Sequence, residues 1–175
     1  MEFPTNDCSL LSAALRTQTM LTPVAEASKK PISLRLEFGV DFESARATSA
    51  AVRIFLAGQG VPNGELFSYE LCMAEACYNA IEYAENPATK SRPFAEVVFT
   101  PEQIEMRVTD RTAGFEMPRN ICAPSPMSDR GRGLFIIQSV MDEVQYLRSP
   151  NENVLVMRKR RPASAALPIA LQAAG

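Results

Sequence analysis

The chain has 175 residues, of which 46% are apolar and 22% charged, and its net charge at neutral pH is −2. This composition is typical of a globular protein with a buried core, and it excludes a general electrostatic attraction to nucleic acid or anionic lipid. Histidine is absent from the sequence, which excludes a Ser-His-Asp or Cys-His catalytic set, a histidine-based zinc site and an autophosphorylated histidine.

The sequence predicts one folded domain over residues 31–161, preceded by a loose arm over 1–30 and followed by a disordered Ala-rich tail over 162–175. No window reaches the ~18 apolar residues of a membrane span, and the first residues lack the basic segment of a secretory signal. The cysteines show no metal-like pairing, so we expect reduced thiols in a cytoplasmic protein. They are Cys8, Cys72, Cys77 and Cys122.

The first half of the domain is predicted to contain a strand followed by two helices. The strand alternates apolar and polar side chains, which indicates that one of its faces is buried. Asp41 is a suitable N-cap for the first helix, and Gly58 and Gly60 end it. The predicted ranges are 32–38 for the strand, and 42–57 and 65–85 for the helices.

The second half is predicted to contain two strands, a polar loop, a helix and a final hairpin. The ranges are 94–100 and 104–109 for the strands, 116–129 for the loop, 131–141 for the helix, and 143–148 and 154–159 for the hairpin. This order predicts an α+β fold, in which helices cover one face of a single mixed or antiparallel sheet as a two-layer sandwich.

Glu75 and Asn79 lie four residues apart on the second helix and therefore on the same face. The amide oxygen of Asn79 is a hard ligand suited to Mg²⁺, and the carboxylate of Glu75 could orient a hydroxyl or accept its proton during phosphoryl transfer. On helical position alone, a solvated polar stripe on an amphipathic helix is the simpler interpretation.

Asp110 follows a predicted strand and precedes a turn at Gly114. A carboxylate at this position could accept a hydrogen bond from an exocyclic amine such as that of adenine, and a glycine lets the backbone come close to a ligand. An ordinary Asp-Gly turn would give the same pattern.

Gly131 and Gly133 precede an apolar run that predicts a helix, with Arg130 and Arg132 beside them. The N–H groups and dipole of a helix N-terminus favour an anion, and the arginines could add charge against a phosphate. A flexible loop that enters a helix is the simpler interpretation of this stretch alone.

Taken together, three stretches resemble the nucleotide-binding boxes of the GHKL (Bergerat-type) ATPases. The resemblance is closest to bacterial anti-sigma-factor serine kinases of the RsbW and SpoIIAB kind, and it covers about residues 32–159. The stretches are 70–81 (Glu-Leu-Cys-Met-Ala-Glu-Ala-Cys-Tyr-Asn-Ala-Ile), 110–115 (Asp-Arg-Thr-Ala-Gly-Phe) and 131–144 (Gly-Arg-Gly-Leu-Phe-Ile-Ile-Gln-Ser-Val-Met-Asp-Glu-Val).

The resemblance implies a Bergerat-type fold, ATP and Mg²⁺ as cofactors, and roles by position. Glu75 stands at the catalytic base, Asn79 at the Mg²⁺ ligand and Asp110 at the carboxylate that recognises adenine. Nucleotide contacts are implied for Gly114, for Gly131 and Gly133 with Arg130 and Arg132, and for Thr112, which stands where the family usually has glycine. The loop 116–129 stands at a short ATP lid.

By the same resemblance, we expect an ATP- and Mg²⁺-dependent serine-protein kinase that phosphorylates a STAS-type antagonist and sequesters a sigma factor or another output protein. It would form a homodimer, with no direct contact with nucleic acid or membrane. The replacement at Thr112 keeps a second hypothesis open, a binding module of the same fold without phosphoryl transfer. The catalytic half of a histidine kinase and a DNA-linked ATPase are less favoured, because the first lacks its histidine and the second needs further domains.

Overall fold

A computed structural model of the protein describes residues 30–83, 92–118, 121 and 131–162. The expected arm, the expected tail and most of the expected lid loop lie outside these residues, so they stay predictions.

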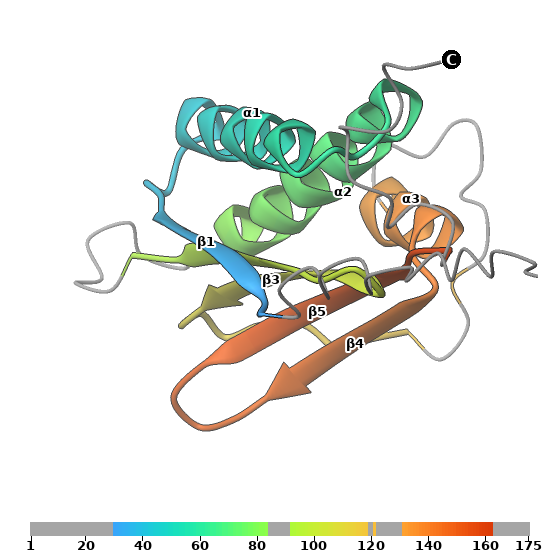
Figure 1. Cartoon of the computed structure of the whole chain (residues 1–175). Coiled ribbons are helices and arrows are strands. Elements are labelled where there is room, and N and C mark those ends of the chain that lie inside the picture. The colour runs from blue at the N-terminus through green and yellow to red at the C-terminus, as the bar shows by residue number, and fades with distance from the viewer. Residues whose placement is uncertain (1–29, 84–91, 119–120, 122–130, 163–175) are drawn as a thin grey trace, which may run out of the picture.

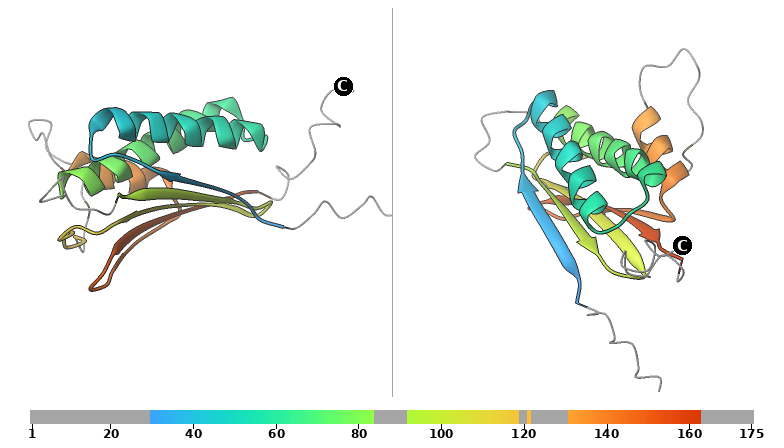
Figure 2. Two further views of the ribbon diagram at one scale, coloured as in Figure 1. Left: turned by 90° about the vertical axis from the view of Figure 1, so that its left-hand side faces the viewer. Right: turned by 45° about the horizontal axis from the view of Figure 1, so that its top comes forward.

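Five strands form one sheet, and three helices cover one of its faces (Figure 1). The two layers are clearest from the side, where all three helices lie above the sheet (Figure 2). The strand order is β1-β2-β3-β5-β4, and every neighbouring pair is antiparallel. This confirms the predicted α+β sandwich with an antiparallel sheet. The elements are β1 (Ile32–Glu37), α1 (Phe42–Gly58), α2 (Asn63–Glu82), β2 (Phe94–Phe99), β3 (Gln103–Asp110), α3 (Arg132–Val140), β4 (Glu143–Arg148) and β5 (Asn153–Arg160).

Helix α1 begins at the predicted residue and ends one residue later than predicted, at Gly58. Asp41 is the N-cap, and its Oδ1 accepts a hydrogen bond of 2.7 Å from the backbone N–H of Ser44. After the last helical residue, Gly58, the chain turns through Gly60, which has φ of +78°. A side chain at that φ would be strained, so glycine favours the end of the helix there.

Helix α2 begins at Asn63, two residues before its predicted start at residue 65. Pro62 is the N-cap with φ of −58°, and its carbonyl accepts a hydrogen bond of 2.9 Å from the N–H of Glu65. Pro62 and Gly64 destabilise the helix little, because they lie at its start, where the first N–H groups have no partner inside the helix. The helix ends at Glu82 with Tyr83 as C-cap, and the rest of the predicted range lies outside the described residues.

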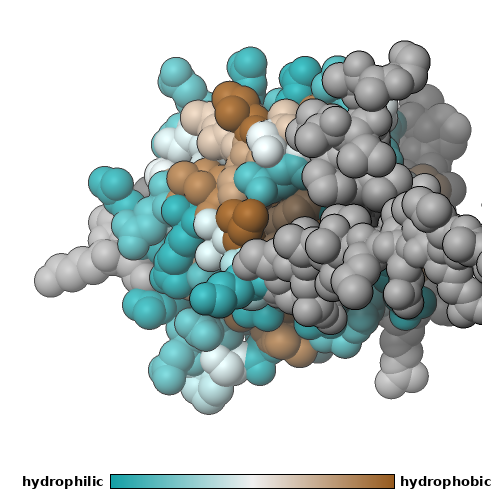
Figure 3. Space-filling view, in the orientation of Figure 1, coloured by the Kyte–Doolittle hydropathy of each residue, from teal (hydrophilic) through white to brown (hydrophobic). Residues whose placement is uncertain are grey.

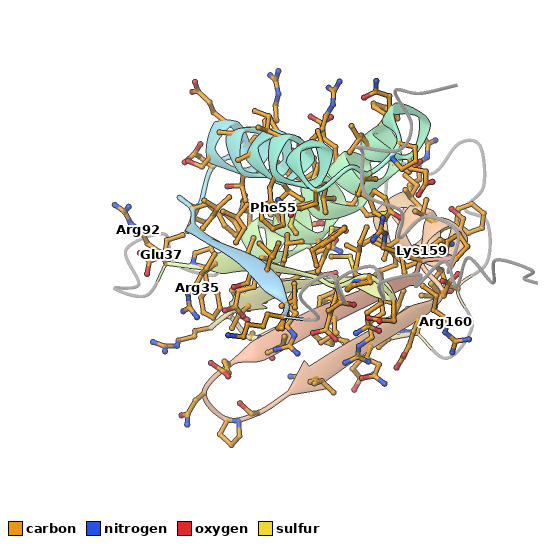
Figure 4. All side chains as sticks on the ribbon, viewed as in Figure 1. Arg35, Glu37, Phe55, Arg92, Lys159 and Arg160 are labelled. Carbon is orange, nitrogen blue, oxygen red and sulfur yellow. The ribbon has the colours of Figure 1, made fainter. Side chains whose placement is uncertain are left out.

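The core fills the space between the helices and the sheet. Phe55 points from α1 toward this space and packs against its margin (Figure 4). Cys72 and Cys77 are free thiols in the core, and burial raises the pKa of both to about 12. The largest fully buried side chains are Leu56, Met73, Ile104, Met106, Ile137, Met157, Val52, Val97 and Val108 with the two cysteines.

Charged side chains lie on the sheet face that the helices leave uncovered, where hydrogen-bonded pairs link neighbouring strands. Arg35 on β1 pairs with Glu96 on β2 at 3.0 Å, and Arg158 on β5 pairs with Glu105 on β3. Exposed large hydrophobic side chains occur on both layers, and Figure 3 shows hydrophobic patches in the upper, central and lower parts of that view. Among the described residues, no helix has the length and apolar content needed to cross a membrane.

Candidate functional site

A small pocket lies where the C-terminal half of α2 meets the end of β3 and the β4–β5 hairpin. It brings Asn79 of α2 together with Asp110 and Thr112, although all of β2 and most of β3 lie between Asn79 and Asp110 in the sequence. The lining residues are Ala76, Asn79, Ala80, Tyr83, Val108, Asp110, Thr112, Phe115, Tyr146 and Leu155.

Asp110 is the last residue of β3, whereas the sequence predicted that it would follow the strand. Its side chain is buried, with 7% of the residue exposed. Oδ1 accepts hydrogen bonds from the backbone N–H of Thr112 at 2.9 Å, the Thr112 hydroxyl at 2.6 Å and the amide of Asn153 at 3.0 Å. Because all these donors reach one oxygen, the carboxylate is held in one orientation and Oδ2 keeps its capacity to accept a bond from a ligand.

Thr112 fits its position without backbone strain. Every non-glycine residue of the described chain has negative φ, Thr112 included. Its hydroxyl donates to Asp110 and accepts a bond of 3.0 Å from the N–H of Gly114. The threonine therefore stabilises the turn where the family usually has glycine.

Gly114 cannot be replaced without moving its neighbours. Its φ is +68°, and a Cβ there would lie 2.6 Å from the hydroxyl of Tyr146 and 3.0 Å from the amide of Asn153. The β4–β5 hairpin also ties this loop down directly. Arg148 donates to the carbonyl of Ala113 at 2.9 Å, and Asn153 donates to that of Thr112 at 3.0 Å.

Three aromatic rings form a stack at the pocket. The ring of Phe115 lies between those of Tyr146, with centroids 4.1 Å apart, and Tyr83, with centroids 5.2 Å apart. The Phe115 N–H also donates a long hydrogen bond of 3.4 Å to the hydroxyl of Tyr146. The cavity that remains measures about 10 Å³, which is room for about one water molecule.

Glu75 does not line this pocket, but it lies one turn before Asn79 on α2 and faces the start of α3. A Cβ on Gly133 would lie 2.7 Å from Oε2 of Glu75 but 3.6 Å from its Cβ, so a side chain at this position would displace the carboxylate. Burial raises the pKa of Glu75 above its ordinary value. Gly131 is the N-cap of α3 in a left-handed conformation with φ of +85°.

The described residues include only one of the two arginines predicted to contact phosphate. Arg132 is the first residue of α3 and is exposed. Arg130 lies outside the described residues, so its predicted phosphate contact stays a prediction.

The amide nitrogen of Asn79 is buried and has no hydrogen-bond partner in the described part of the chain. A buried donor without a partner is costly, and one that faces a pocket indicates a polar ligand there. The described residues hold no group of three or more Cys, Asp or Glu that could bind a metal by themselves.

Sequence reasoning missed four residues that build the site: Tyr83, Tyr146, Arg148 and Asn153. The hairpin connection was predicted to include Asn153, but it is the first residue of β5, is 3% exposed and pairs with Asp110 across the sheet. Only the strand register reveals this contact, because the two residues are far apart in the sequence. Tyr83 could have been found from its position one turn after Asn79.

The comparisons with known proteins agree with the fold. The sequence matches a family model described as a histidine kinase-like ATPase domain over residues 38–159. None of the curated proteins searched matches the chain. Among 13 matching chains of solved structures is the crystal structure of the RsbU and RsbW domains of Rv1364c from Mycobacterium tuberculosis, with a TM-score of 0.56 and 16% identity. The match covers 75% of this chain and 34% of that one, so this chain spans about a third of its length, and the likeness is one of fold.

Proposed function

We propose that this chain, which belongs to the histidine kinase-like ATPase domain family, is an ATP- and Mg²⁺-dependent kinase that phosphorylates a serine of a small partner protein. One observation carries the proposal. The carboxylate of Asp110, fixed by three hydrogen bonds, and the unpartnered amide of Asn79 line the same pocket. A nucleotide would satisfy both groups.

Asp110 would bind the base. Its Oδ2 can accept a hydrogen bond from the exocyclic amine of adenine, whereas the carbonyl that guanine carries at the same place would face the carboxylate with acceptor against acceptor. Asn153 and Thr112 would keep the carboxylate in position for this choice.

Asn79 would hold the metal through its amide oxygen. The oxygen and nitrogen of an asparagine amide are assigned from the surrounding hydrogen bonds, so the unpartnered buried end of Asn79 can be the oxygen that faces the ion. Mg²⁺, when bound, supplies positive charge to the phosphate oxygens during the transfer.

Glu75 would accept the proton of the incoming serine hydroxyl. Its raised pKa supports this role, because a carboxylate that binds protons more tightly is a better base near neutral pH. The first turn of α3 lies against the same carboxylate. The N–H groups there, with Arg132 and the predicted contribution of Arg130, would hold the phosphates near this base.

The partner is proposed to be a STAS-type antagonist, with sequestration of a sigma factor or another output protein by a homodimer in the cytoplasm. The support is the resemblance of the nucleotide-binding stretches, together with a fold shared with a structure that contains an RsbW domain.

A binding module without phosphoryl transfer is the second candidate. The observation that favours it is the closed pocket, whose cavity of about 10 Å³ is far too small for a base. In this case the chain would sequester its partner with nucleotide unbound, or bound only to stabilise the fold.

The two candidates are separated by a transfer assay. A pull-down from the native cell, with phosphosite mapping of the small protein that co-elutes, would identify the substrate for the assay. The kinase proposal predicts phosphoserine on that protein with Mg-ATP, lost in Glu75→Gln but kept in Glu70→Gln, a control on the same helix that pairs with Arg53. Stable partner binding without any transfer by the wild type would favour the module instead.

A further inference from the structure

Phe115 lines the pocket and stacks on both Tyr83 and Tyr146. Its ring is nearly parallel to its neighbours, with angles of 17° to Tyr146 and 29° to Tyr83. The same residues line the cavity with Asn79 and Asp110. A flat ring is therefore sandwiched between two tyrosines, beside the polar groups that would bind a base.

The loop geometry holds Phe115 in this place. Gly114 turns the chain with positive φ directly before it, and its backbone packs against the hydroxyl of Tyr146. That hydroxyl accepts the N–H of Phe115, and Arg148 fixes the preceding carbonyl of Ala113. Phe115 itself is only half-buried, so it can leave the pocket without unfolding the core.

We propose that Phe115 occupies the base position of the nucleotide site, so that a purine binds only after this ring has left the sandwich. This inference rests on the proposed function. A phenyl ring can stack on Tyr83 and Tyr146, but it offers no hydrogen-bond donor to the carboxylate of Asp110 in the same pocket. A purine stacks on the same rings and also offers polar edges, so the exchange replaces one stack by another and adds hydrogen bonds.

The need to displace Phe115 sets the apparent affinity of the site for a nucleotide and its preference for ligands with a flat base. The apparent affinity of a site that is mostly closed is lowered by the fraction of molecules that are open. A ligand with a flat base recovers the cost of displacing Phe115 by stacking in its place. A polyphosphate without a base would bind only near α3 and would be indifferent to Phe115.

The test compares the binding of Mg-ADP and of Mg-tripolyphosphate by calorimetry in the wild type, Phe115→Ala and Phe67→Ala. Phe67 is 67% exposed near the start of α2 and serves as the matched control. Phe115→Ala should lower the apparent Kd for Mg-ADP roughly tenfold, which corresponds to about 1.4 kcal/mol. It should leave tripolyphosphate binding unchanged, and Phe67→Ala should change neither.

The opposite result is equally clear. Unchanged or weaker binding of Mg-ADP by a folded Phe115→Ala would overturn the inference, because Phe115 would then be a platform for the base or irrelevant to it. An absence of ADP binding by both proteins would instead overturn the proposed function, and the inference with it.

If Phe115→Ala does not fold, hydrogen exchange of the wild-type protein tests the inference instead. Hydrogen exchange at the N–H of Phe115 should become faster when ADP binds, because its bond to the Tyr146 hydroxyl opens as the ring leaves. Slower exchange on binding would show that Phe115 stays in the sandwich, and the inference would be wrong.

Discussion

At the residue scale, Glu75 is placed where chemistry and stability make opposite demands. Its carboxylate is partly withdrawn from water against Gly133, which favours a proton acceptor but is unfavourable for a charge. Glu75→Gln should keep the shape of the contact and remove the base. We expect it to bind Mg-ADP as the wild type does and to lose at least ~10²-fold in transfer rate, measured as phosphoserine formed over time. A variant that transfers at the wild-type rate would exclude Glu75 as the base.

The same substitution should change how stability depends on pH. Burial raises the pKa of Glu75 above its ordinary value of 4.5 in the folded protein, so the folded state binds this proton more tightly than the unfolded state. The stabilisation that protonated Glu75 gives the folded state is complete below pH 4.5 and is lost as the pH rises through the folded pKa. Glutamine does not titrate, so Glu75→Gln should gain stability relative to the wild type as the pH rises above 4.5 and through the folded pKa of Glu75. Urea midpoints at each pH measure the difference, and parallel curves would contradict the prediction.

Asn153 is a positioning residue, since it bonds Asp110 and the carbonyl of Thr112 but does not line the pocket. Asn153→Ala should weaken Mg-ADP binding roughly tenfold and lower the free energy of unfolding by about 1–3 kcal/mol, because a buried hydrogen bond to a charged group is lost. Asn151→Ala, in the exposed turn next to it, is the control and should change neither. Calorimetry and urea unfolding measure the two effects, and equal behaviour of the two variants would remove Asn153 from the site.

At the element scale, the sheet carries a charge cluster whose members lie on three strands. Glu105 on β3 is 7% exposed and bonds Arg158 on β5, which also bonds Glu143 on β4 at 2.9 Å. Burial alone would raise the pKa of Glu105, but the hydrogen bond and charge of Arg158 and the charge of Arg107 outweigh it and lower that pKa. The cluster therefore ties β4, the strand that carries Tyr146, to the centre of the sheet.

Glu105→Gln should lower the free energy of unfolding by about 2 kcal/mol near neutral pH, because it removes a charged partner from Arg158. The folded pKa of Glu105 is below 4.5, so this contribution is present above that value and is lost as the pH falls through the folded pKa. The difference between the variant and the wild type should therefore shrink in acid. Glu96→Gln, in the more exposed pair with Arg35, should cost less than about 1 kcal/mol. Urea unfolding would contradict this ranking if both variants lost the same amount.

At the scale of the whole molecule, local patterns predicted the elements but not the contacts between distant ones. Alternation and helical periodicity were enough for the order of strands and helices, and capping chemistry placed the start of α1 at Asp41. The pairing of Asp110 with Asn153 depends on the register between β3 and β5, which hydrophobic alternation alone does not determine. The occupation of the pocket by Phe115 depends on ring packing from three elements, and a motif carries no information about that.

The whole fold should respond to nucleotide, because its site joins α2, β3 and the β4–β5 hairpin. A ligand that binds only the folded state stabilises it by about 2.7 kcal/mol at a hundredfold excess over Kd, which for a domain of this size raises Tm by roughly 10 °C. Asp110→Asn should abolish this shift for ADP, since the amide can present a donor to the adenine amine.

Chelation of Mg²⁺ should reduce the shift for ATP more than for AMP, because the ion would act at the phosphates. If chelation reduced the Tm shift equally for both nucleotides, the metal would lie elsewhere than at Asn79. The AMP measurement therefore distinguishes a metal that binds the nucleotide from one that supports the fold.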